Sequence, residues 1–144
     1  MGLLISLFFQ SAEGFSHEGQ IHQKTDSVPK SEEKVGLQRV SALYDKNVKT
    51  IFQRSCFDCH GQATRYPWYY KVPGVKQLID RDVTEAKKHL DITNGFPFQG
   101  HGTPQKDLEA IEKSIRDKTM PPWRYLIMNG EAKISKEDKT AILD

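Results

Sequence analysis

The seven residues "SCFDCHG", Ser55 to Gly61, hold both cysteines of the chain and a histidine directly after the second one. The C-x-x-C spacing occurs in redox dithiols, in structural zinc sites and in sites of covalent haem attachment. A thioredoxin-like dithiol needs a strand–helix context and has no use for the histidine. Zinc would need a distant fourth ligand such as His89 or His101, and adjacent Cys59 and His60 fit one tetrahedron poorly.

The full C-x-x-C-H pattern favours the third chemistry, attachment of a haem c. On a helix, Cys56 and Cys59 project from neighbouring turns, so each sulfur can reach one vinyl group of the haem. His60 then approaches the iron from the same side. Thioether bonds would consume both thiols, so an exported protein with two cysteines needs no disulfide. We therefore predict one covalent haem c held by Cys56 and Cys59, with His60 as the proximal iron ligand.

The predicted distal iron ligand is Met120, in "KTMPPWRY". Pro121 disfavours a helical conformation at Met120, and the two prolines keep the following backbone extended. A stiff loop is well suited to hold a weak thioether ligand at a fixed distance. Met128 is interpreted as a flexible core residue instead. His101 and His89 remain the alternative distal ligands.

The surroundings of the haem are expected to come from the segment Tyr66–Pro73. Axial histidines donate their second ring N–H to a carbonyl or carboxylate, and for His60 we predict a backbone carbonyl of this segment. The aromatic run predicts Trp68 and Tyr69 as a wall against the haem, with polar groups such as Arg65 meeting the propionates. Ordinary core packing is the alternative for part of this run.

Helical periodicity dominates the chain, and no stretch alternates like a strand. Only 37% of the residues are hydrophobic, so the core of a domain this small is thin, and a large apolar cofactor would add to it. We predict an all-α domain with long loops around one covalently bound haem. The expected helices lie within Asp45–His60, Pro73–Asp91, Thr103–Asp117 and Ser135–Asp144.

The first 36 residues are expected to lie outside the domain. Residues 1–14 contain an apolar run followed by small residues, which predicts an export signal peptide. No Lys or Arg precedes this run, a departure that a truncated start would explain, and the run is too short to span a bilayer. Residues 15–36 are polar and are expected to be a loosely ordered lead-in. The domain itself is expected over residues 37–144.

With these residues assembled, the chain resembles the small monohaem c-type cytochromes of the haem-binding domain family over about residues 40–143. The resemblance implies a mostly helical cytochrome c-like fold, thioethers from Cys56 and Cys59, His60 as proximal ligand and Met120 as distal ligand. No role is predicted for the insert "NGFPFQGHGTP", residues 94–104. The matching residues are Asp45, Val48, Ile51, Cys56, Cys59, His60, Pro67, Trp68, Tyr69, Pro73, Asp82, Val83, Leu90, Met120, Pro121, Pro122, Tyr125, Ile134 and Ser135.

The functional expectation is an exported, periplasmic, monomeric cytochrome that carries single electrons between redox protein partners and is not an enzyme. The alternative is a peroxidase-like enzyme or small-ligand sensor with an open or labile distal site, with His101 as its acid–base residue. A zinc module and an accessory module of a larger redox enzyme also remain open. The net charge of +2 includes no basic run of the kind that binds nucleic acids.

Overall fold

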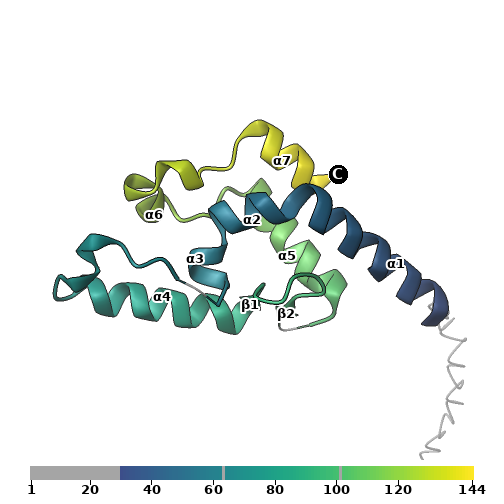
Figure 1. Cartoon of the computed structure of the whole chain (residues 1–144), viewed down its shortest axis with the longest axis horizontal. Helices are drawn as coiled ribbons and strands as arrows, with labels where there is room; N and C mark the ends of the chain where they lie inside the picture. Colours follow the sequence, from purple (N-terminus) through teal and green to yellow (C-terminus); the bar gives the residue numbers. More distant parts are fainter. Residues whose placement is uncertain (1–29, 63, 101) are drawn as a thin grey trace, which may run out of the picture.

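The computed structural model describes residues 30–62, 64–100 and 102–144 (Figure 1). In this part of the chain the predicted all-α fold is confirmed, and strand is limited to two short pairs of residues. The signal peptide predicted over 1–14, residues 15–29 of the lead-in and His101 lie outside the described residues. The elements are α1 (Lys30–Leu43), η1 (Tyr44–Val48), α2 (Lys49–Ser55), α3 (Phe57–His60), η2 (Trp68–Lys71), α4 (Val75–His89), β1 (Leu90–Asp91), β2 (Gln99–Gly100), α5 (Pro104–Arg116), α6 (Trp123–Met128), η3 (Gly130–Ala132) and α7 (Lys136–Leu143).

Helix α1 was not predicted. It begins at Lys30, so residues 30–36 of the expected loose lead-in are helical, and Glu32 and Glu33 lie in its first turn, where the helix dipole favours negative charge. The helical path continues from α1 through the π-helical turn η1 into α2. Because no helix starts at that point, neither Asp45 nor Asn47 acts as an N-cap.

The predicted helices in the second half are present and begin at recognisable caps. The Thr103 hydroxyl accepts a hydrogen bond from the Lys106 amide at the start of α5, followed by a proline in the first turn. Ser135 and Asp138 form the expected capping box of α7, with distances of 2.9 and 3.0 Å. Local sequence signals therefore locate these helices correctly.

The core is an aromatic cluster next to the α3 turn. Tyr44 and Phe52 pack against Phe98, with ring centroids 5.3 and 5.9 Å away, and Phe96 and Ile92 complete the buried group. Two of these five residues come from the insert at 94–104, to which the sequence assigned no role. Burial also raises the pKa of Tyr44 to about 12.

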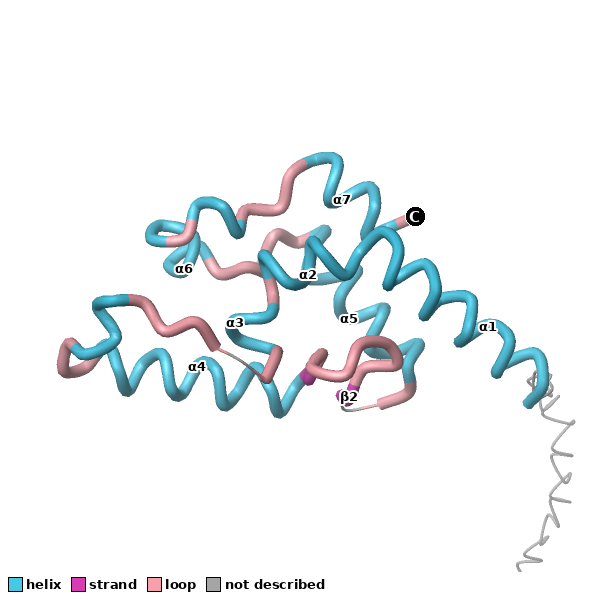
Figure 2. Tube along the Cα trace, viewed as in Figure 1, coloured by secondary structure: helices cyan, strands magenta, loops and turns pink. Residues whose placement is uncertain are grey.

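Helix α3 occupies the middle of the molecule, with α4 along one side and α6 and α7 on the other (Figure 1). After α4, residues 90–100 fold back as a small antiparallel pair in which Leu90 faces Gly100 and Asp91 faces Gln99. The tube view shows the predicted loops between α3 and α4, between α4 and α5, and between α5 and α6, whereas α1 to α3 follow one another with almost no loop (Figure 2). None of the helices in the described ranges has the length and apolar character needed to cross a membrane.

Candidate functional site

The two cysteines lie at a bend between α2 and α3. Cys56 has φ −123° and ψ −29°, so it departs from helical geometry while its amide still bonds to the Phe52 carbonyl at 2.8 Å. The Cys56 carbonyl accepts the amides of Cys59 and His60, at 3.2 and 3.0 Å. One residue thus ends α2 and starts the single turn of α3. This bend brings both thiols and the imidazole onto one short turn.

The ring of His60 is oriented by the segment that follows α4. Its Nδ1 lies 2.8 Å from the Leu90 carbonyl oxygen, and because a carbonyl only accepts, Nδ1 carries the proton and Nε2 keeps its lone pair. The Ile92 amide donates to the His60 carbonyl at 3.0 Å. The predicted acceptor within 66–73 is therefore wrong. Leu90 takes its place because it leaves the helix at the end of α4, with φ −158° and ψ 116°.

The protonation states in this site suit ligation rather than redox dithiol chemistry. Burial lowers the pKa of His60, although the hydrogen bond to Leu90 opposes the shift, so the imidazole is neutral at pH 7, as a metal ligand must be. Burial, and next the charge of Cys59, raise the pKa of Cys56 to about 12. Redox C-x-x-C sites instead lower the pKa of one thiol.

Asp58, between the two cysteines, is the buried centre of a polar network that no sequence pattern indicated. Its Oδ2 accepts a hydrogen bond from the Tyr125 hydroxyl at 2.7 Å, and Arg65 Nε binds Oδ1 at 3.0 Å. Burial, and then this bond to Asp58, raise the pKa of Tyr125. Arg65, considered for the propionates, is thus bound to Asp58. The spacing of Asp58 could have indicated its burial, because it lies three residues after Ser55, on the same buried helical face.

Met120 lies in the connection between α5 and α6, outside any helix, as the prolines predicted. Its side chain is 43% exposed, whereas Pro121 is buried. The connection is anchored at its start, because the Thr119 amide donates to the Ser114 carbonyl near the end of α5 at 3.0 Å. Met128 is 52% exposed, so its predicted role as a core residue is wrong.

Large apolar side chains are exposed mainly on two segments, 66–78 and 120–128. In Figure 1, η2 lies beside the start of α4, at the end of that helix away from α3, and α6 lies across from it. Of the ten such side chains exposed among the described residues, eight lie in these segments. They are Tyr66, Trp68, Val72, Leu78, Met120, Trp123, Ile127 and Met128.

These features fit a haem. A neutral imidazole with a free Nε2, two thiols on the same turn and nearby exposed apolar surface match the donors and the apolar body of a haem c. Of the two predicted wall residues, Tyr69 is half-buried and Trp68 is 83% exposed, and their rings meet edge to face with centroids 5.5 Å apart. Zinc gains no support, because no group of three or more His, Cys, Asp or Glu in the described ranges could hold a metal ion.

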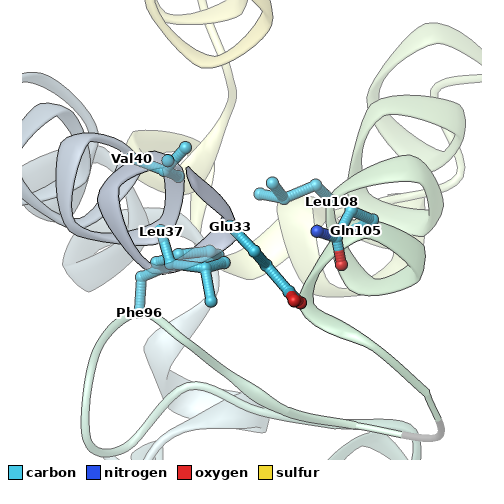
Figure 3. Close-up of a pocket in the computed structure, with 7 residues that line it drawn as sticks. Glu33, Leu37, Val40, Phe96, Gln105 and Leu108 are labelled. Carbon is cyan, nitrogen blue, oxygen red and sulfur yellow. The ribbon is translucent and has the colours of Figure 1, made fainter. Parts of the chain in front are cut away.

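A separate pocket of about 550 Å³ lies between α1, α5 and Phe96 (Figure 3). Leu37, Val40 and Leu108 give it apolar walls, and Glu33 and Gln105 add polar groups. None of the residues predicted to hold the haem lines this pocket, so it is distinct from the site at α3.

Comparison with known proteins agrees with the assignment of a haem site. A family model described as "Haem-binding domain" matches residues 19–144. The chain is 33% identical over 109 residues to "Cytochrome c peroxidase Ccp" of Escherichia coli (strain K12), an alignment that covers 73% of this chain and 23% of that protein. The chain therefore spans less than a quarter of the length of this curated relative. No solved structure matches.

Proposed function

Because the chain belongs to the haem-binding domain family and is therefore a haem protein, we propose that it is an exported, periplasmic monohaem c-type cytochrome that carries single electrons between redox proteins. The observation that carries this proposal is the His60 ring, which the Leu90 carbonyl holds with Nε2 available for the iron, one residue after Cys59. When bound, the haem supplies an iron that changes between the ferric and ferrous states.

The residues of the chain then have separate tasks. Cys56 and Cys59 hold the haem covalently, which keeps it bound in a dilute compartment. Leu90 keeps the proton on Nδ1 of His60, and this bond increases the basicity of the ligating nitrogen. Met120 would supply its thioether as the second iron ligand, which would favour the ferrous state and raise the potential above that of a bis-histidine site.

A role as an accessory module is the second candidate function. It is favoured by the similarity to a protein named cytochrome c peroxidase, because the matching region makes up only 23% of the length of that protein. In this role the chain would pass electrons to a separate enzyme instead of reducing peroxide itself. A peroxidase or sensor of its own would need an open distal position, so binding of carbon monoxide or cyanide without displacement of a methionine would favour that alternative.

The test is the absorbance of the oxidised and reduced full-length protein, purified from a host that attaches haem c. The expected protein is coloured, keeps its haem after denaturation, and shows the methionine-to-iron charge-transfer band in the ferric state. A colourless protein would contradict the haem c assignment.

Substitution of the two methionines tests the distal ligand. Met120→Ala should keep the covalent haem but abolish the charge-transfer band, because the iron loses its thioether. Met128→Ala is the matched control, since it removes the same chemical group from α6 and should keep the band. If the band survives Met120→Ala, Met120 is not the ligand.

A further inference from the structure

Helix α6, which follows Met120 after two prolines, is held only weakly by apolar packing. It has six residues, and none of them is buried. Trp123, Ile127 and Met128 are 75%, 67% and 52% exposed. Helices this short are unstable on their own, so contacts with the rest of the fold must fix the position of α6.

The strongest such contact joins α6 to the turn that carries the cysteines and the histidine. The Tyr125 hydroxyl donates to Asp58 Oδ2 at 2.7 Å, and the Asp58 side chain is only 11% exposed. Hydrogen bonds to a carboxylate are about twice as strong as neutral ones, and low exposure strengthens them further. Arg65 binds the same carboxylate and keeps its position fixed.

A second polar contact joins α6 to α4. Arg124 Nη2 lies 2.7 Å from Asp82 Oδ2, but this pair is more exposed, at 51% and 29%, so it contributes less. Adjacent residues of α6 therefore bind two different helices. One of them, α3, carries His60, and the other, α4, ends at Leu90, whose carbonyl orients the His60 ring.

From this arrangement we infer that Asp58 and Tyr125 are a positioning pair for the distal iron ligand. The connection that contains Met120 is anchored at one end by Thr119 on Ser114 and at the other by α6. The bond between Tyr125 and Asp58 fixes the second end, so it restricts where the Met120 thioether can lie. The inference rests on the proposed ligation by Met120.

The physical reason is preorganisation of a weak ligand. A thioether competes for the iron with any external ligand, and a connection that is held in place loses less conformational freedom when its methionine binds. Tyr125→Phe keeps the ring and removes only the hydroxyl. The Met120 segment then samples more conformations, and an added imidazole displaces the thioether more easily.

Imidazole titration of the ferric full-length holoprotein tests the inference, with loss of the charge-transfer band as the readout. We expect Tyr125→Phe to bind imidazole about tenfold more tightly than the wild type, a change of ~1.4 kcal/mol. Thr140→Val is the control, because it also removes one hydroxyl that donates a hydrogen bond, to the Lys136 carbonyl at 3.1 Å within α7. It should leave the imidazole affinity unchanged.

The outcomes separate the two proposals. If the wild type lacks the band, the proposed ligation is wrong and the inference fails with it. If the wild type has the band but Tyr125→Phe binds imidazole like the wild type, the inference is wrong and the ligation stands. If Tyr125→Phe yields no holoprotein, Asp58→Asn replaces it in the titration. This variant keeps an acceptor for the tyrosine but removes the charge, and an unchanged imidazole affinity would again overturn the inference.

Discussion

Gly61, directly after His60, lies against the ring of Phe57. It ends α3 with extended backbone, φ −103° and ψ 179°, so conformational freedom does not explain the glycine. The reason is space, because a Cβ at position 61 would overlap the Phe57 ring, including its Cγ atom near the stem of the side chain. Any larger residue must therefore displace Phe57 or the end of α3.

We expect Gly61→Ala to lower the free energy of unfolding by about 2 kcal/mol, because overpacking forces the ring and the backbone apart. Urea denaturation followed by circular dichroism measures this. Gly36→Ala is the control: a Cβ there meets nothing within 4 Å, and in the interior of α1 it should increase stability by about 0.5–1 kcal/mol. Equal effects of the two variants would exclude the steric explanation.

At the level of single residues, the sequence predicted the attachment motif but not the partners of its side chains. The prediction that Cys56 and Cys59 hold a haem and that His60 binds its iron follows from a spacing rule, and it stays a prediction. The acceptor of His60, by contrast, depends on where α4 ends and how it packs, which no local pattern near the motif encodes. The same holds for Asp58, whose partner Tyr125 is 67 positions away.

Among the elements, α7 is fixed to α2 through one carboxylate. Asp138 Oδ2 accepts the Ser135 amide at 2.9 Å within the capping box and also binds Arg54 Nη2 at 2.5 Å. Burial alone would raise the pKa of Asp138, but the hydrogen bonds from Ser135 and the charge of Arg54 outweigh it, so the pKa is lowered overall.

This shift predicts a pH-dependent stability. A carboxyl group with a lowered folded-state pKa stabilises the fold above its unfolded pKa, about 3.9, and this contribution is lost as pH falls through the lower folded value. Asp138→Asn should therefore lower the free energy of unfolding by about 1 kcal/mol at pH 7. In acid, the variant and the wild type should have the same stability. Urea unfolding at several pH values measures it.

The control for this prediction is Asp45→Asn, which breaks the exposed pair between Asp45 and Lys49. Its effect should be about 0.3 kcal/mol or less. If the stability difference between wild type and Asp138→Asn stays constant from pH 7 into acid, the charge of the Asp138 carboxylate does not stabilise the fold.

The helices that the sequence predicted are those whose own residues show apolar periodicity or a side-chain cap. α4 and α5 have clear apolar periodicity, and α5 and α7 have side-chain caps. α1 and α6 were missed because they bury no residue, and no side-chain cap marks the beginning of α6. Their positions depend on neighbouring elements.

For the whole molecule, the aromatic core joins distant parts of the chain. Tyr44 and Phe52 come from the first helical run, and Phe96 and Phe98 come from the insert before α5. The sequence predicted an all-α fold with a thin core, but it could not assign the insert, because two phenylalanines in a segment with prolines and glycines have no regular periodicity.

We expect Phe98→Ala to lower the free energy of unfolding by about 3–5 kcal/mol, since a buried ring is replaced by a cavity. Thermal and urea unfolding measure this. Val35→Ala, at a side chain 64% exposed on α1, should change stability by about 0.5 kcal/mol or less. A loss below 1 kcal/mol for Phe98→Ala would show that the insert does not form part of the core.

The bond between Leu90 and His60 connects this core to the imidazole that is proposed to bind the iron. Leu90 begins β1, which continues into buried Ile92 and pairs with the strand next to Phe98. The imidazole thus receives its orientation from the same backbone that encloses the aromatic cluster. When that cluster loosens, the orientation of the His60 ring must loosen with it. In the haem-bound state proposed above, the colour of the protein would therefore report on the integrity of its core.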